Sequence, residues 1–195
     1  PVGSMIVDIG GGTTDIAVIS LSGIVRSVNL KIAGDKFNTD IIGYLRDEFK
    51  LLIGEKTAES VKIAIGSVAP GDPMEAEVRG RDLVTGLPRE VVITDADIRE
   101  AMGQSILGLI DGIKEVLETT PPEILGDIMH RGIVLSGGGA LLHGLDVLLQ
   151  NMLKIPVTVT EDPLTAVARG AGIVLEDINY YKEVLLPDYD TERSK

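Results

Sequence analysis

The amino-acid sequence predicts an α/β fold, in which a β-meander and later strand–helix units form one mixed sheet and a small α+β lobe is inserted. Residues 5–32 contain three short β-rich segments joined by tight turns, which is typical of antiparallel strands. Residues 132–179 alternate strand-like and helix-like segments, a pattern that favours parallel strands. The stretch between these two parts has a short helix and alternating strands of its own, which indicates the inserted lobe.

The meander opens the chain. Residues 5–9 are apolar and β-rich, residues 15–20 return after a glycine turn, and residues 24–32 follow a turn at Ser22 and Gly23. Two helices come next. The first is predicted over residues 36–52, since its apolar side chains share one helical face, and Gly54 is expected to end it.

The second helix, residues 57–65, is shorter and has Thr57 as a possible N-cap. Alternation of apolar and polar residues then predicts strands at residues 74–79 and 89–94. A long amphipathic helix follows over residues 96–119. We expect Asp95 to cap this helix and the following Thr-Pro-Pro sequence to stop it.

The last third of the chain is predicted as two strand–helix units, with strands at residues 132–135 and 156–160 and helices at residues 141–153 and 163–179. Together these elements divide the chain into three expected units. They are a core lobe of residues 1–50 and 96–180, an inserted lobe of residues 51–95, and an acidic tail of residues 181–195.

Composition excludes several classes of function. The net charge of −12 disfavours a general nucleic-acid binder, since such a chain repels phosphate backbones. The chain has no Cys, and His130 and His143 lack metal-ligand spacing, so a zinc site is not expected. No apolar run approaches the ~20 residues that span a bilayer, which suggests a cytoplasmic protein. Because the chain opens on Pro1 and enters a strand almost at once, we expect it to be a piece of a longer protein.

The first glycine turn follows the first predicted strand. Gly10, Gly11 and Gly12 leave the backbone N–H groups uncovered, so that these groups can converge on an anion. Thr13 and Thr14 add hydroxyl donors. Asp8, at the end of the strand, can hold a metal ion through water or orient an attacking water. The alternative is a tight hairpin that needs positive φ, although such a hairpin explains neither the carboxylate nor the threonines.

The second glycine turn lies between a predicted strand and a predicted helix. It comprises Ser136, Gly137, Gly138, Gly139 and Ala140. Its backbone can approach a ligand closely, and the helix N-terminus offers free N–H groups. The alternative is a crowded packing turn. Neither glycine turn matches a dinucleotide fingerprint, and the chain has no Walker-type phosphate loop.

The order of the two turns resembles the actin, Hsp70 and sugar-kinase superfamily, whose second phosphate loop and adenosine loop they match. More specific stretches look like the MreB family of bacterial actin homologues, and the resemblance covers about residues 1–178. These stretches are residues 53–59, 80–83, 85–89, 120–123 and 161–170. The resemblance implies a ribonuclease H-like actin fold that binds ATP and Mg²⁺.

The resemblance also assigns roles to residues. Contacts to the β- and γ-phosphates would come from Gly11, Gly12 and Thr13, and Asp8 and Thr13 would help to place the attacking water. Gly34 and Asp35 would lie near the ribose. Glu59 and Lys62, one turn apart on the short helix, would flank the adenosine, and their alternative role is a solvated surface ion pair. The second glycine turn, from Ser136 to Gly139, would pack against the nucleoside and α-phosphate.

For the whole protein, the resemblance implies an ATPase whose filaments lie on the inner face of the cell membrane and control cell shape and cell-wall elongation. Its partners would be further copies of itself, the membrane surface, mainly through the N-terminal half, and elongation proteins such as RodZ. That half carries the first phosphate loop and the catalytic carboxylate, so we expect this chain alone to be inactive. The alternatives are a sugar kinase or chaperone ATPase, and a non-enzymatic interaction module.

Overall fold

The computed structural model describes residues 2–20 and 23–182, and its largest element is a five-stranded sheet in the order β3-β2-β1-β7-β8. The strands β1 (Ser4–Ile9), β2 (Thr14–Ser20) and β3 (Gly23–Leu30) form the predicted antiparallel meander. The strands β7 (Ile133–Ser136) and β8 (Val157–Val159) run parallel to β1, as the strand–helix alternation predicted. Most of the expected acidic tail, residues 183–195, lies outside the described residues.

The central position of β1 decides where the two glycine turns meet. Met5, Val7 and Ile9 alternate along β1 and are fully buried on the face that the helices cover. In the register of β1 with β7, Asp8 lies opposite Ser136. Each of these two strands ends at a glycine turn, so both turns lie at the same edge of the sheet.

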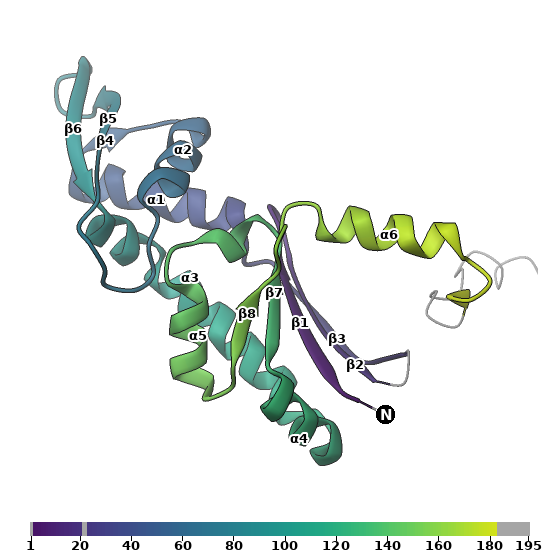
Figure 1. The fold of residues 1–195 in the computed structure, drawn as a ribbon. Helices are drawn as coiled ribbons and strands as arrows, with labels where there is room; N and C mark the ends of the chain where they lie inside the picture. The colour runs from purple at the N-terminus through teal and green to yellow at the C-terminus, as the bar shows by residue number, and fades with distance from the viewer. Residues whose placement is uncertain (1, 21–22, 183–195) are drawn as a thin grey trace, which may run out of the picture.

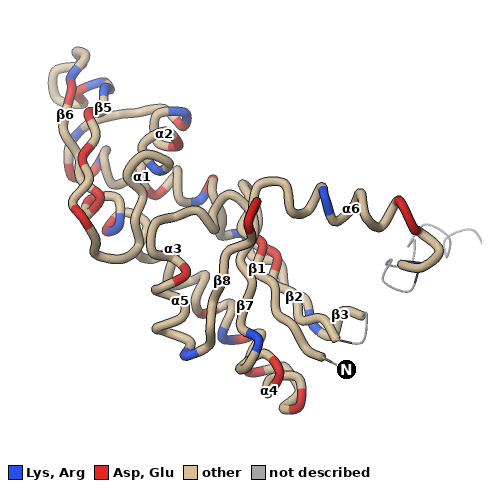
Figure 2. Tube along the Cα trace, viewed as in Figure 1, with Lys and Arg blue, Asp and Glu red and all other residues tan. Residues whose placement is uncertain are grey.

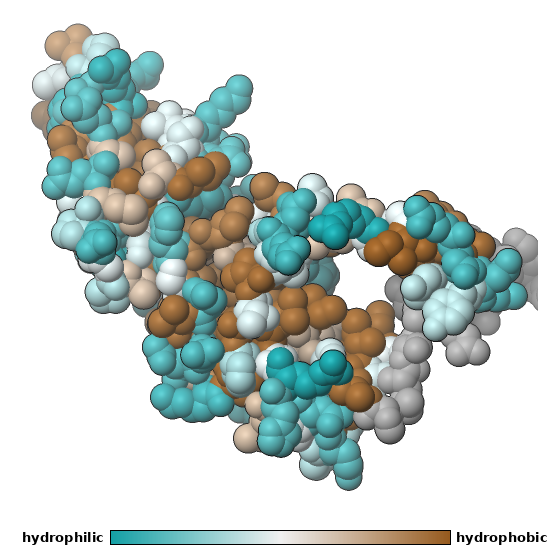
Figure 3. Space-filling view, in the orientation of Figure 1, coloured by the Kyte–Doolittle hydropathy of each residue, from teal (hydrophilic) through white to brown (hydrophobic). Residues whose placement is uncertain are grey.

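Helices α1 (Gly34–Glu48) and α3 (Asp95–Glu118) pack against each other and form much of the core with their apolar faces. Figure 1 shows α3 running behind the sheet, with α5 (Leu145–Leu153) beside β8. The opposite face of the sheet is open in this view. Figure 3 shows hydrophobic atoms gathered over the middle of that face, where β7 and β1 lie in Figure 1.

A second, three-stranded sheet has the order β4-β5-β6 and lies beyond α1 in Figure 1. Its strands are antiparallel and comprise β4 (Leu51–Leu52), β5 (Glu75–Asp82) and β6 (Pro88–Thr94). Helix α2 (Glu55–Ile65) connects β4 to β5 and packs on α1 through Ala58 and Val61. Helix α2 therefore lies over the N-terminal end of α1.

The prediction of one helix over residues 36–52 was wrong at its C-terminal end. Helix α1 stops at Glu48, and Lys50 adopts a left-handed φ of 54° that turns the chain. Leu51 then pairs with β5 and is fully buried. Gly54 does not end α1 but serves as the N-cap of α2, so Thr57 lies inside that helix rather than at its start.

Two further boundaries differ from the prediction. Thr94, not Asp95, caps α3, because its hydroxyl accepts a hydrogen bond from the backbone N–H of Asp97 and the Asp97 carboxylate accepts from the N–H of Thr94. The prolines after α3 also begin a helix that the prediction missed, α4 (Pro122–Arg131). Proline at the first helical turn is favourable, since its missing N–H has no helical partner there.

The predicted helix over residues 141–153 begins later than expected. The second glycine turn continues into one 3₁₀ turn, η1 (Gly138–Leu141), and the α-helix α5 starts only after Gly144, whose φ is +78°. The second glycine turn therefore leads into a 3₁₀ turn and not, as predicted, directly into an α-helix.

The last helix, α6 (Ala166–Glu176), is shorter than predicted and projects away from the sheet (Figure 1). None of its residues is buried within the described chain, and Leu175 is 71% exposed. The charged residues of α6 are Arg169 and Glu176, and most of the helix is uncharged (Figure 2). Within the described residues, no helix combines the length and apolar character needed to cross a membrane.

Candidate functional site

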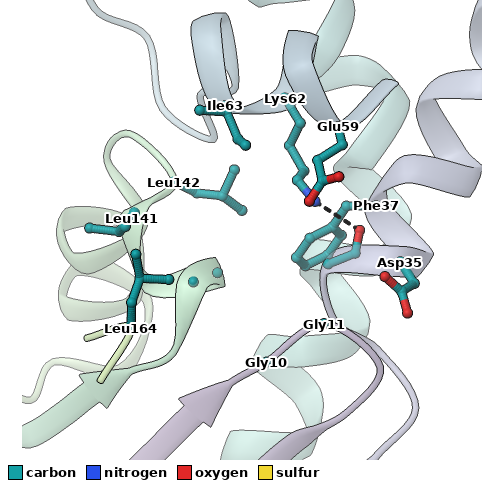
Figure 4. A pocket seen from close by; sticks show the side chains of 13 residues that line it. Gly10, Gly11, Asp35, Phe37, Glu59, Lys62, Ile63, Leu141, Leu142 and Leu164 are labelled. Carbon is teal, nitrogen blue, oxygen red and sulfur yellow. Dashed lines mark hydrogen bonds between the residues drawn. The ribbon is translucent and has the colours of Figure 1, made fainter. Parts of the chain in front are cut away.

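A cavity of about 390 Å³ opens where the first glycine turn, the start of α1, helix α2 and η1 converge. This volume is in the usual range for small-molecule sites. Figure 4 shows the cavity from close by. The residues that line it come from segments distant in the sequence: Gly10, Gly11, Gly34, Asp35, Phe37, Glu59, Lys62, Ile63, Gly138, Gly139, Leu141, Leu142 and Leu164.

Backbone hydrogen bonds tie the first glycine turn to the start of α1. Gly10 donates to the carbonyl of Thr13 at 2.9 Å, which closes the turn. Gly34 donates to the carbonyl of Gly10 at 3.1 Å, and Asp35 donates to the carbonyl of Gly11 at 2.8 Å. The turn is therefore held against α1 through its carbonyl groups, and its glycines leave the backbone open toward the cavity.

The carboxylate of Asp35 lies over this turn. A methyl group at Gly11 would be 3.7 Å from Asp35 Oδ1, and one at Gly12 would be 3.8 Å from Asp35 Oδ2. A carboxylate accepts hydrogen bonds from hydroxyl groups and repels phosphates, so Asp35 suits a sugar hydroxyl better than an anion.

Lys62 reaches from α2 across the cavity mouth. Its Nζ donates a 3.0 Å hydrogen bond to the carbonyl of Gly34, drawn as a dashed line in Figure 4. Burial lowers the pKa of the Lys62 ammonium group, although the charges of Glu59 and Asp35 raise it. Glu59, which lies beside Lys62 in Figure 4, forms no ion pair with it among the described residues. The pair is thus not a simple surface salt bridge.

The second glycine turn packs against the end of β1. Gly137 has a φ of +80°, and a side chain there would collide with the carbonyl of Ile9 and lie 2.9 Å from Asp8 Oδ1. Gly139 has no room for a methyl group beside the Ile9 side chain. Of the five residues in this turn, Gly138 and Gly139 line the cavity. The turn is thus tightly packed, and the same packing brings the backbone of Gly138 and Gly139 to the cavity, while contact with a ligand stays a prediction.

Several predicted residues do not line the cavity. Thr14 is fully buried, and its hydroxyl donates to the carbonyl of Ile32 at 2.6 Å, so it ties the meander to the segment between β3 and α1. Ser136 and Ala140 are also buried, and the Ser136 hydroxyl donates to the carbonyl of Pro163 at 3.4 Å. Gly12, Thr13 and Gly137 lie on the glycine turns but outside the lining.

Asp8 lies below both turns and outside the cavity lining. Its Oδ1 is buried and has no hydrogen-bond partner among the described residues. A buried carboxylate oxygen is costly unless a donor or cation satisfies it. Asp8 therefore fits a Mg²⁺ ion held through a water molecule, and a bound ion would supply positive charge beside the glycine turns.

The prediction missed the apolar walls of the cavity. Phe37 is fully buried at the start of α1, while Ile63, Leu141, Leu142 and Leu164 surround the opening. These residues looked like ordinary helix faces in the sequence. The one available signal was the Leu-Leu pair directly after the second glycine turn. The cavity combines apolar walls with backbone donors, a cation and two carboxylates, so it suits a ligand that has a flat apolar part, hydroxyl groups and an anionic part.

The chain is similar to several known proteins. The family model described as "MreB/Mbl protein" matches residues 1–183. The chain is 52% identical over 180 residues to the cell shape-determining protein Mbl of Bacillus cereus, covering 92% of this chain and 54% of that protein. It is also 52% identical over 180 residues to the cell shape-determining protein MreB of Escherichia coli, covering 92% of this chain and 52% of that protein. The chain thus spans about half the length of these relatives.

Solved structures confirm the fold class. The structure of MreB5 of Spiroplasma citri bound to ADP has a TM-score of 0.90 and 41% identity, covering 94% of this chain and 56% of that one. The same protein bound to AMPPNP gives the same score. The MamK double helical filament has a TM-score of 0.76 and 26% identity, covering 89% of this chain and 54% of that one. With an actin-type α/β fold and a family model that matches nearly its whole length, the chain belongs to the MreB/Mbl family.

Proposed function

We propose that this chain is one lobe of an actin-like, ATP-binding cytoskeletal protein and that its cavity holds the nucleoside and phosphates of ATP from one side. The observation that supports this most directly is the convergence of Gly10, Gly11, Gly138 and Gly139 with Lys62 on one cavity. The relative MreB5 of Spiroplasma citri has been crystallised with ADP and with AMPPNP.

In this proposal the first glycine turn, Gly10 to Gly12, with Thr13, contacts the β- and γ-phosphates. Asp8 holds Mg²⁺ through water and, with Thr13, helps to place the attacking water. Thr14 contributes through the meander that it secures rather than through its hydroxyl, which is engaged with Ile32. These residues position charge but supply no covalent chemistry.

The nucleoside occupies the part of the cavity that α2 and the start of α1 line. Asp35 and the backbone of Gly34 face the ribose, and Glu59 and Lys62 flank the adenosine. The backbone of Gly138 and Gly139 approaches the nucleoside and α-phosphate, while Ser136, Gly137 and Ala140 hold this turn against β1. The apolar walls cover the flat faces of the base.

For the whole protein we propose an ATPase whose nucleotide state biases filament assembly. The curated relatives are called cell shape-determining, and the MamK neighbour forms a filament. We propose the same roles here, with filaments on the inner face of the cell membrane and partners that include RodZ. Residues 1–50 and 96–180 would form one lobe, residues 51–95 a second, and the catalytic carboxylate would come from an N-terminal half.

A nucleotide titration tests the proposal. The chain should bind a fluorescent ATP analogue saturably in the presence of Mg²⁺, and ATP and ADP should displace it. The Gly11→Asp substitution places a carboxylate where phosphates bind, so we expect affinity to fall about tenfold or more, the equivalent of ~1.4 kcal/mol. Gly54→Asp is the matched control, because Gly54 lies outside the cavity, has no neighbour within 4 Å and caps α2.

Failure of ATP to displace the analogue would contradict the proposal and favour a non-enzymatic interaction module. Transfer of the γ-phosphoryl group to a sugar would favour a sugar kinase. We also expect the chain alone to hydrolyse ATP far more slowly than a protein that carries both halves. Comparable turnover by the two would show that the second half is not needed for catalysis.

A further inference from the structure

A short backbone pairing joins the end of α2 to the end of η1. We name residues 66–68 and 142–144 the seam. Val68 donates to the carbonyl of His143 at 2.9 Å, and His143 donates to the carbonyl of Gly66 at 3.2 Å. Ser67 pairs with His143 as an isolated parallel bridge. The seam therefore links two segments that are distant in the sequence, by a bridge that belongs to neither sheet.

The seam connects two opposing walls of the nucleotide cavity. Lys62 and Ile63 line the cavity from α2, directly before the seam, and Leu142 lines it from the seam itself. Figure 4 shows the side chains of Ile63 and Leu142 pointing toward each other across the cavity. The distance between α2 and the second glycine turn thus depends on how closely residues 66–68 approach residues 142–144.

Behind the seam lies a second cavity, of about 350 Å³. Ser67, Ala69, His143 and Gly144 line it, so the side of the seam that faces away from the nucleotide cavity is not backed by the core. Since packing behind the seam is incomplete, its own hydrogen bonds and close contacts must hold it in place.

Two glycines permit the close approach within the seam. A methyl group at Gly66 would collide with the carbonyl oxygen of Lys62 at 2.2 Å and would lie 3.1 Å from Leu142 Cδ2. Gly144 has a φ of +78°, and a methyl group there would lie 2.8 Å from Ala69 Cβ. Ser67 is 4% exposed, and its hydroxyl donates to the carbonyl of Ala69 at 2.6 Å. This bond shapes the loop against which Gly144 packs.

We propose that Gly66, Ser67 and Gly144 are positioning residues of the nucleotide cavity: without touching the ligand, they hold Leu142 opposite Lys62 and Ile63 and so set the width of the nucleoside subsite. The inference rests on the proposed nucleotide binding. Its consequence is specific, because the seam adjoins Leu142, Lys62 and Ile63, whereas the first glycine turn is held by hydrogen bonds to Gly34 and Asp35. A change in the seam should weaken contacts to the nucleoside and spare the contacts of the β- and γ-phosphates with the first glycine turn.

The Gly144→Ala variant tests this proposal in the chain with Mg²⁺ present. We expect the Kd values for ATP and for adenosine, each measured by displacement of a fluorescent ATP analogue, to rise by about the same factor, on the order of tenfold. The ratio of the two Kd values reports the phosphate contacts and should stay at the wild-type value. Gly71→Ala is the matched control in the same loop, since nothing lies within 4 Å of Gly71.

Two further variants guard against a general loss of structure. Ala69→Gly removes the atom that Gly144→Ala meets, whereas the strain of alanine at a φ of +78° remains, so the double variant should recover part of the lost affinity. Ser67→Ala removes only a hydroxyl and should raise both Kd values by less than Gly144→Ala does. Equal Kd values in wild type, Gly144→Ala and Ser67→Ala would overturn the role of the seam, and so would an altered ratio. Absence of ATP binding in the wild type would instead overturn the proposed function.

Discussion

The ammonium group of Lys62 donates a 3.0 Å hydrogen bond to the carbonyl oxygen of Gly34 and so bridges α2 and the start of α1 at the cavity mouth. The same group faces Glu59 and Asp35, whose charges oppose the effect of burial on its pKa. This single contact connects the two segments that we assign to the ribose and the adenosine.

Replacement of Lys62 should weaken nucleotide binding. Lys62→Met keeps an apolar stem of similar length but removes the charge, so we expect the Kd for ATP to rise about tenfold, or ~1.4 kcal/mol. Displacement of a fluorescent ATP analogue measures the change. Lys56→Met is the control, because Lys56 is exposed on the same helix and does not line the cavity. An equal effect of both substitutions on the Kd for ATP would show that Lys62 does not contact the nucleotide.

The lowered pKa of Lys62 predicts a pH dependence of stability. At neutral pH both folded and unfolded states carry the charged group, and burial disfavours it in the folded state. As the pH rises through the folded pKa toward 10.5, the unfolded state binds more protons, so the free energy of unfolding should rise relative to that of Lys62→Met. Urea denaturation of both proteins between about pH 8 and 10.5 checks this. A difference that falls with pH would contradict it.

The second glycine turn should not tolerate a side chain at Gly137. Alanine there combines a φ of +80° with a collision against the Ile9 carbonyl, so we expect a loss of about 2 kcal/mol or more in the free energy of unfolding. Gly43→Ala is the control, because Gly43 lies in α1 with nothing within 4 Å and should gain roughly 0.5–1 kcal/mol. Chemical denaturation gives both values. Equal stability of the two variants would show that the turn can relax.

The two adjacent threonines should behave differently. Thr14→Val removes a buried hydroxyl and leaves the Ile32 carbonyl without its donor, so we expect a loss of about 1–3 kcal/mol in stability and little change in nucleotide affinity. Thr13→Val should instead weaken ATP binding and leave the thermal midpoint near its wild-type value. The reverse pattern would mean that Thr14, and not Thr13, faces the phosphates.

The hairpin between β5 and β6 should lose stability in acid. Asp82 accepts hydrogen bonds from the backbone N–H groups of Thr85 and Val84 and from Arg89, and these contacts lower the pKa of its carboxyl to about 2. Its contribution is present above the unfolded pKa of 3.8 and is lost as the pH falls toward 2. Asp82→Asn should therefore lower the thermal midpoint at pH 7 and have a smaller effect near pH 2.

A matched substitution separates this effect from general acid denaturation. Asp72→Asn removes a carboxylate that accepts no hydrogen bond among the described residues, so its thermal midpoint should follow that of the wild type at every pH. If Asp82→Asn lowered the thermal midpoint by the same amount from pH 7 to pH 2, the amide would destabilise the hairpin for reasons other than the lost charge.

Local patterns in the sequence predicted most elements but not their ends. The apolar, β-rich run of β1 and the long apolar stripe of α3 are strong local signals, and both elements were found. The end of α1 was missed because Lys50 adopts a left-handed conformation, which the presence of a lysine does not predict. Helix α4 was missed because the prolines were interpreted only as a stop, although proline also favours a first helical turn.

The sequence by itself determined that this chain has two glycine turns at strand ends, an α/β fold and the MreB/Mbl resemblance, because turn chemistry and periodicity are local properties. Only the tertiary structure decided what each glycine does. The parallel pairing of β1 with β7 puts the turns side by side, so that Gly137 packs on Ile9 and Gly138 faces the cavity. Likewise Thr14 turned inward, because β-strand residues alternate between faces and the tertiary packing decides which face is buried.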